Sequence, residues 1–276
     1  MSISKIIHHI APSDRSRWHP MWERCYPSWR EQYPDFEHKL WNDQEDIDHL
    51  VEEHYPDYYD TYINFPLHIM KIDFARFCIL NKFGGIYADM DVYCYKNFYN
   101  ELTNKVYVQQ APYGDVPVEN ALMASEPGNE FWLKCLDKSV EVYNEKVKRR
   151  ENTLSLKHRL DQLIITSATG PHLVFEVLKE NPNGVDILPG IVYNNHGLSY
   201  HPEFRTKHML TGMWGKEAYN SKDTYIQELS KYSDLTGVTI DTFDFYKDYT
   251  NGGYITKSHF DLNEYIKQKQ VEFNYD

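Results

Sequence analysis

One stretch of the chain constrains its fold more than any other: a helix-like segment followed by two glycines. Residues 66–83 carry apolar side chains at helical spacing, with Phe74 and Phe77 on one face, which predicts a long, partly buried helix. Gly84 and Gly85 follow directly and end this helix, because glycine adopts positive φ values without steric cost. A long helix therefore leads through a tight turn straight into the next segment.

That next segment is a short apolar run, residues 86–88, which predicts a strand ending at Asp89 and Asp91. Side chains two residues apart in an extended chain point to the same face, so both carboxylates can reach one ligand. Ligands of open α/β sheets lie at the carboxyl ends of strands, and two carboxylates suit Mg²⁺ or Mn²⁺. A polar turn after a strand has the same spacing, so this pair alone leaves both interpretations open.

The predicted helix carries Asp73 and Arg76 at positions i and i+3, on one face. One interpretation is an ordinary intrahelical ion pair, which stabilises by about 0.2–0.5 kcal/mol. The other places both side chains beside the ligand of Asp89 and Asp91, because the helix leads directly into that strand.

The remaining pattern is typical of an α/β domain. Strands are expected at 3–10, 36–41, 106–110 and 118–124, and helices at 20–32, 42–50, 128–142, 172–180, 225–232 and 262–268. The helix at 20–32 is expected to be kinked or interrupted at Pro27, and Asn42 or Asp43 to cap the following one. The opening order of strand, helix, strand, helix predicts a parallel nucleotide-binding sheet.

Composition excludes several classes of function. The 276 residues suffice for one large domain, and no Pro/Gly/Ser-rich linker divides them. The formal net charge of -12 argues against a nucleic-acid partner, and the basic cluster at 146–159 is flanked by Glu145 and interrupted by Glu151, as on a solvated helix face.

Location is predicted from the termini, the apolar runs and the cysteines. Residues 1–10 are too polar for a signal peptide, and no apolar run is long enough for a membrane span. Cys25, Cys78 and Cys135 stand among apolar neighbours, as reduced core residues do. A soluble, cytoplasmic protein is expected.

The run DFARFCILNKFGGIYADMD at 73–91 resembles the signature of glycosyltransferase family 32, and it is similar to the glucosyltransferase domains of large clostridial toxins. Further segments resemble family elements, at 5–10, 28–36 and 40–43, and more loosely at 120–125 and 169–171. The resemblance implies a GT-A fold, a Rossmann-like mixed sheet flanked by helices, in which residues 1–276 form a single domain with helical additions. The nucleotide-sugar is expected to bind to 1–125, and acceptor-side elements to lie in 126–276.

The implied activity is metal-dependent transfer of a hexose, with retention, from a nucleotide-sugar to a glycan or protein hydroxyl. UDP-glucose is the favoured donor and Mn²⁺ or Mg²⁺ the cofactor. The resemblance implies three overlapping groups of site residues: catalytic Asp73, Arg76 and Asn120; donor-binding Ile10, Ala11, Asp73, Arg76, Tyr87, Asp89 and Trp214; and metal-binding Asp89, Asp91 and His208.

Some of these assignments have alternatives. Ala11 stands where related enzymes carry a tryptophan that stacks on uracil, so Trp18 or Trp41 is a possible substitute. His196 and His201 are alternatives to His208 as the third metal ligand.

Two other functions compete with transfer. Aspartyl-nucleophile phosphatases also use Asp-x-Asp, but they place Thr or Val where this chain has Tyr93, and the motif normally follows their first strand. A catalytically silent domain that binds nucleotide-sugar or glycan remains the main alternative. Donor consumption separates an enzyme from such a binder.

Overall fold

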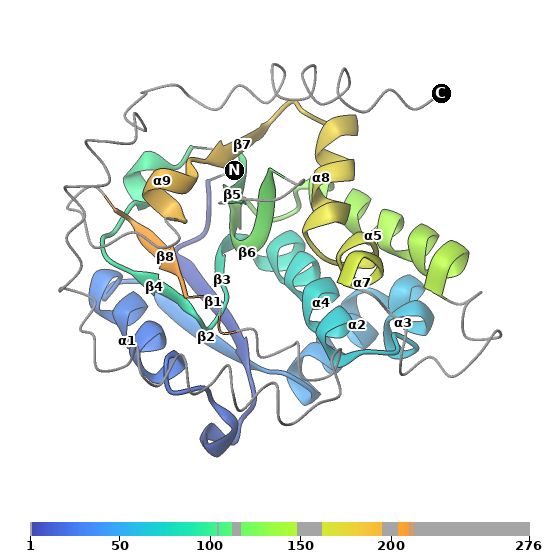
Figure 1. Ribbon diagram of the computed structural model, residues 1–276, viewed down its shortest axis with the longest axis horizontal. Helices are drawn as coiled ribbons and strands as arrows, with labels where there is room; N and C mark the ends of the chain where they lie inside the picture. Colours follow the sequence, from blue (N-terminus) through green and yellow to red (C-terminus); the bar gives the residue numbers. More distant parts are fainter. Residues whose placement is uncertain are drawn as a thin grey trace.

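The computed structural model describes residues 2–103, 105–111, 117–147, 162–194, 204–209 and 211. Within these residues the central sheet has six strands in the order β2-β1-β3-β6-β5-β7 (Figure 1). Its strands are β1 (Ile6–Ala11), β2 (Glu37–Asn42), β3 (Gly85–Ala88), β5 (Val106–Gln110), β6 (Val118–Ser125) and β7 (Val185–Leu188). The sheet is mixed: β1 is parallel to β2 and β3, and β5 to β7, whereas β6 is antiparallel to β3 and β5.

Helices cover both faces of this sheet. They are α1 (Trp22–Gln32), α2 (Glu45–His54), α3 (Pro56–Ile63), α4 (His68–Phe83), α5 (Glu130–Val142), α7 (Gln162–Ala168), α8 (Pro171–Glu180) and α9 (Gly190–Tyr193), with shorter helical turns η1 (Arg15–Arg17), η2 (Tyr99–Glu101) and η3 (Tyr143–Val147). Helices α2 to α5, α7 and α8 share one hydrophobic core with the sheet. On the opposite face lie α1, α9 and a small sheet of β4 (Val92–Cys94) and β8 (Thr206–His208) (Figure 1). The predicted architecture, a mixed sheet flanked by helices, is confirmed.

Helix α4 lies against the sheet and ends as the glycine pair predicts. Gly84 has φ 62° and donates its N–H to the carbonyl of Leu80, and Gly85 has φ 90°. A Cβ atom on Gly85 would lie 2.5 Å from the carbonyl oxygen of Ile6 in β1. The glycine therefore allows β3 to approach β1 closely while the chain leaves the helix.

Two buried histidines of β1 bond to backbone carbonyls at the two ends of β3. His8 Nε2 bonds to the carbonyl oxygen of Gly84 at 2.9 Å, and its Nδ1 accepts from the Trp41 indole at 3.2 Å. His9 Nδ1 donates to the carbonyl of Ala88 at 2.8 Å. Burial lowers the pKa of each histidine to about 3, so both rings are neutral in the folded protein.

Several expectations from sequence are corrected or completed. Pro27 does not interrupt α1, because the side chains of Cys25 and Trp29 are fully buried and their packing outweighs one lost backbone hydrogen bond. The N-cap position of α2 is Gln44, and the predicted capping residue Asn42 lies two residues earlier, where its side-chain oxygen accepts the N–H groups of residues 44 and 45. Helices α3 and α7 and the strand pair β4–β8 were not expected. The helices predicted at 225–232 and 262–268 lie outside the described residues.

The four cysteines are buried and free, as expected for reduced core residues. None of the described helices combines the length and apolar character needed to cross a membrane. The cytoplasmic location stays a prediction.

Candidate active site

The two aspartates lie where the chain leaves the central sheet. The N–H of Asp89 still donates to the carbonyl of Ala121 in β6 at 2.8 Å, and the chain then turns, with Val92 N–H donating to the carbonyl of Asp89 at 3.0 Å. Asp91 ends this turn and leads into β4. The polar-turn interpretation is therefore right about the backbone, and the two carboxylates nevertheless approach one common point.

Arg76 is the centre of a buried network beside this turn. Its guanidinium nitrogens lie 2.9 Å from Asp73 and 3.2 Å from Asp89, and they donate to the carbonyl oxygen of Asn120 at 2.7 Å. The ring of Tyr87 lies 5.0 Å from the guanidinium carbon. The predicted pair of Asp73 and Arg76 is thus present. It is part of a network that joins α4, β3 and β6, and is not an exposed intrahelical pair.

Asp73 is held in place from two further elements. Its carboxylate accepts from the Asn120 amide at 3.0 Å and from the Thr169 hydroxyl at 3.3 Å. Burial raises the pKa of Asp73 to about 6, although the positive charge of Arg76 opposes this effect. At neutral pH the side chain is mainly a carboxylate that accepts hydrogen bonds on both oxygens.

Asp89 is the more accessible of the two aspartates. Its side chain is 26% exposed, against 11% for Asp91, and it accepts from the Tyr87 hydroxyl at 2.8 Å. Burial raises the pKa of Asp89, while Arg76 lowers it and the nearby Asp91 adds to the increase. One carboxylate therefore faces both the arginine network and the neighbouring aspartate.

Asp91 is fixed by residues that arrive from far along the chain. One carboxylate oxygen accepts from both the N–H and the hydroxyl of Thr211, at 2.8 and 2.9 Å. The other lies 3.3 Å from His208 Nε2. Burial opposes ionisation of Asp91, but His208 and the Thr211 donors outweigh it and hold its pKa below the usual range. His208 reaches this position because β8 pairs antiparallel with β4, with His208 opposite Val92.

Asp89, Asp91 and His208 therefore form a possible cation site. One ligand atom from each lies within 4.8 Å of the other two. Two carboxylate oxygens and an imidazole nitrogen form a donor set that suits Mn²⁺ and accommodates Mg²⁺ less well, because Mg²⁺ prefers oxygen ligands. The third ligand suggested by the sequence, His208, is thus beside both aspartates.

The other predicted donor residues are placed differently. Ile10 and Ala11, at the end of β1, are buried. Trp18 packs in a cluster with Ala11 and Tyr26, and Trp41 packs on His8, which favours a packing role for both tryptophans. His196, His201 and Trp214 lie outside the described residues.

Sequence reasoning missed Glu119, Asn194 and Thr211, and it assigned no role to Thr169. Glu119 accepts from His208 Nδ1 at 3.1 Å and from the Asn194 amide at 2.7 Å. A signal for Glu119 exists in the sequence: it stands next to Asn120, and the two are adjacent polar residues in an otherwise apolar strand.

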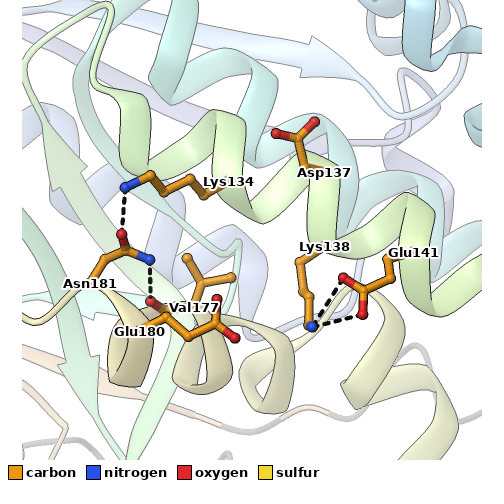
Figure 2. A pocket seen from close by; sticks show the side chains of 7 residues that line it. All are labelled: Lys134, Asp137, Lys138, Glu141, Val177, Glu180 and Asn181. Carbon is orange, nitrogen blue, oxygen red and sulfur yellow. Dashed lines mark hydrogen bonds and ion pairs between the residues drawn. The ribbon is translucent and has the colours of Figure 1, made fainter.

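A pocket of about 440 Å³ lies between α5 and α8 (Figure 2). Its lining residues include none of the site residues described above, which are Asp73, Arg76, Asp89, Asp91 and His208. Lys134 bonds to Asn181 and Lys138 to Glu141, so both of its lysines are paired with neighbouring side chains (Figure 2). Asn181 gives Lys134 a hydrogen-bond acceptor and Glu141 gives Lys138 a charged partner, and among the described residues the pocket holds no cluster of metal-binding side chains like that of the aspartate turn.

Residues 20–110 match the protein-family model described as "Glycosyltransferase sugar-binding region containing DXD motif". This part of the chain is similar to the sugar-binding region of DXD-type glycosyltransferases. The DXD region includes Asp73, Arg76, Asp89 and Asp91, whereas His208 lies beyond the matched residues. The predicted relationship to DXD glycosyltransferases is confirmed.

The chain is also similar to yeast proteins whose names describe mannose transfer. Mannosyl phosphorylinositol ceramide synthase SUR1 of Saccharomyces cerevisiae is 31% identical over 144 residues, 52% of this chain and 36% of that protein. Inositol phosphoceramide mannosyltransferase 3 of Schizosaccharomyces pombe is 32% identical over 103 residues, 37% of this chain and 28% of that protein. The chain thus spans about a third of the length of these relatives.

Among solved structures, the chain is similar to one titled "PaToxG Glycosyltransferase". The TM-score is 0.48 and the sequence identity 17%, with 83% of this chain and 79% of that chain covered.

Proposed function

We propose that this protein is a metal-dependent glycosyltransferase that moves a hexose from a nucleotide-sugar to a hydroxyl acceptor with retention of configuration. The observation that carries this proposal is the convergence of Asp89, Asp91 and His208, with ligand atoms within 4.8 Å of one another. The match of residues 20–110 to a DXD glycosyltransferase region supports the same conclusion independently.

In this proposal Asp89, Asp91 and His208 hold the divalent cation, with Mn²⁺ favoured over Mg²⁺ by the imidazole. The bound cation supplies charge neutralisation for the diphosphate that leaves the sugar. Thr211 keeps Asp91 ionised and oriented through its two hydrogen bonds. Asp91 is therefore ready to serve as a ligand without first losing a proton.

The arginine network is the proposed binding site for the donor sugar and ribose. The Nε group of Arg76 is buried and has no hydrogen-bond partner among the described residues. Leaving a buried N–H group unpaired costs about 1–3 kcal/mol. A hydroxyl or phosphate oxygen of the nucleotide-sugar would accept a hydrogen bond from this N–H group. Asp73, Asn120 and Tyr87 hold the guanidinium and Asp89 in place for this contact. Ile10 and Ala11 are proposed to lie near the base, and Trp214 near the diphosphate.

We propose front-face transfer, in which the acceptor hydroxyl approaches from the side of the departing diphosphate. This route requires positioning and charge stabilisation from the protein, and needs no protein nucleophile. The rigid network around Arg76 suits that requirement, because its members fix one another from α4, β3, β6 and the short segment between α7 and α8.

The identity of the sugar stays a prediction. UDP-glucose is the donor favoured by the sequence resemblance, while the names of the yeast relatives specify mannose and inositol phosphoceramide. The proposed acceptor is a hydroxyl of a glycan, a lipid-linked inositol or a protein. A panel of nucleotide-sugars identifies the donor, and the acceptor is a separate question.

The deciding experiment measures donor hydrolysis in the absence of acceptor. The protein is incubated with Mn²⁺ and UDP-glucose, UDP-galactose, UDP-N-acetylglucosamine or GDP-mannose, and free nucleoside diphosphate is measured. We expect release from one donor and a decrease of about 100-fold or more for Asp91→Asn, which removes a charged ligand. Asp186→Asn, an exposed site on β7, is the control of equal charge change and keeps wild-type release.

Two outcomes would refute the proposal in different ways. Tight, Mn²⁺-dependent nucleotide binding without release from any donor would identify a silent binding domain. Unchanged release by Asp91→Asn would mean that the cation site is wrongly assigned.

A further inference from the structure

Glu119 lies on β6 next to Asn120, but the two side chains face opposite sides of the sheet. Asn120 bonds to Asp73 on the α4 side, whereas Glu119 bonds to His208 and Asn194 on the side of β8. Strand β6 therefore contributes Asn120 to the arginine network and Glu119 to the contact with His208.

A single oxygen of Glu119 receives two donors. Its Oε2 atom lies 3.1 Å from His208 Nδ1 and 2.7 Å from Asn194 Nδ2. Asn194 is itself buried and held by a second bond from its amide to the carbonyl of Gln110, at 3.0 Å. Asn194 thus links the Glu119 carboxylate to β5 and holds it in position beside the histidine.

His208 has its two ring nitrogens on different partners. Nε2 faces Asp91 at 3.3 Å, and Nδ1 faces Glu119 at 3.1 Å. Among the described residues, the group of mutually close ligand atoms comprises Asp89, Asp91 and His208 and does not include Glu119. Glu119 therefore stands behind the histidine, on the side away from the proposed cation.

From this geometry we infer that Glu119 is a positioning residue of the cation site. It holds the proton of His208 on Nδ1 and fixes the ring, so that the Nε2 lone pair is directed at the cation beside Asp91. A carboxylate that accepts the second N–H of a ligating histidine sets its tautomer and increases its basicity. This inference rests on the proposed function, because it presupposes that Asp89, Asp91 and His208 bind a cation.

Direct Mn²⁺ binding tests the inference without relying on activity. Free Mn²⁺ is measured by electron paramagnetic resonance during titration of the full chain, with no nucleotide present. Loss of such a partner weakens metal binding by about 10- to 100-fold, and we expect this loss for Glu119→Gln. Asp186→Asn removes the same charge from an exposed position on β7 and is expected to change the Kd by less than about twofold.

Glu119→Asp separates positioning from charge. Aspartate keeps the negative charge but has a shorter side chain, so it loses the contact with His208 Nδ1. We expect Glu119→Asp to weaken Mn²⁺ binding nearly as much as Glu119→Gln, whereas wild-type affinity would overturn the positioning role. Circular dichroism melting of each variant identifies any unfolded protein before titration.

A spectroscopic signature completes the test. In the Mg²⁺-loaded protein, ring ¹⁵N shifts of His208, assigned with His208→Gln, are expected to report one tautomer with the proton on Nδ1. In Glu119→Gln they are expected to shift toward a mixture, and an unchanged tautomer would overturn the inference. Wild-type protein that binds no Mn²⁺ would refute the cation site itself and this inference with it, whereas wild-type binding that all Glu119 variants retain would refute the role of Glu119 alone.

Discussion

Removing the charge of Arg76 tests whether the network beside the aspartate turn stabilises the fold as well as the site. The side chain is 3% exposed and lies 2.9 Å from Asp73 and 3.2 Å from Asp89. Arg76→Met keeps much of the aliphatic volume and deletes the guanidinium. Both carboxylates then lose their cationic partner in a buried setting.

The magnitude follows from these contacts. Two unit charges about 4 Å apart attract each other by about 4 kcal/mol at an effective dielectric constant of about 20. Breaking a buried ion pair by removing one partner costs about 3–5 kcal/mol. We therefore expect Arg76→Met to lower the free energy of unfolding by about 4 kcal/mol near pH 8.

The loss is expected to depend on pH, with a defined sign. Asp73 already has a pKa of about 6 in the presence of Arg76, and without Arg76 both carboxyl pKa values are higher still. A folded-state pKa above the unfolded value means that the folded protein binds more protons, so stability falls as pH rises through that window. The variant should therefore lose more stability at pH 8 than at pH 5, where its carboxyl groups are protonated.

Equilibrium urea unfolding at both pH values measures this effect. Lys105→Met is the matched control, because Lys105 forms an exposed pair with Asp186 and its loss is expected to cost less than about 1 kcal/mol. A loss below about 1 kcal/mol for Arg76→Met, or one that is equal at pH 5 and pH 8, would refute the reasoning.

Two further predictions concern the elements that support the site. Burial lowers the pKa of His8 and of His9 to about 3, so the unfolded chain takes up protons between pH 6.5 and 3 that the folded protein does not. The free energy of unfolding should fall by about 2 kcal/mol per histidine from pH 7 to pH 5, offset in part by Asp73, and urea titrations showing no net decrease would contradict this. Gly85→Ala should destabilise strongly, because its Cβ would lie 2.5 Å from a β1 carbonyl oxygen; Gly184→Ala, also at positive φ but with open space around it, should cost only about 1 kcal/mol. Similar melting temperatures for the two variants would show that the close approach of β3 and β1 is not a constraint.

The α4–β3 unit is predictable from sequence because its signals are local. Helical spacing, two glycines and a short apolar run each act within a few residues of one another, and the observed bounds agree within about two residues. The strands β4 and β8 are three residues each, and their pairing depends on contacts between distant segments. No local pattern predicts such a pair.

The candidate site divides in the same way. Asp73, Arg76, Asp89 and Asp91 are predictable together because they lie on one continuous helix–strand unit. The environment of Asp91 depends on Thr211, which is 120 residues further along the chain. Burial of the arginine network is likewise a tertiary property, and this is why sequence alone underestimates the pair of Asp73 and Arg76 as a surface interaction.

The pairing of β8 with β4 has a consequence for the time at which the site forms. During synthesis, both aspartates leave the ribosome long before β8 exists, and Thr211 follows Asp91 by 120 residues. A nascent chain that stops short of β8 can form the aspartate turn but lacks the imidazole and the two donors that complete it. In a translation-arrest or refolding experiment, cation uptake at the proposed site would therefore report that β8 has paired with β4.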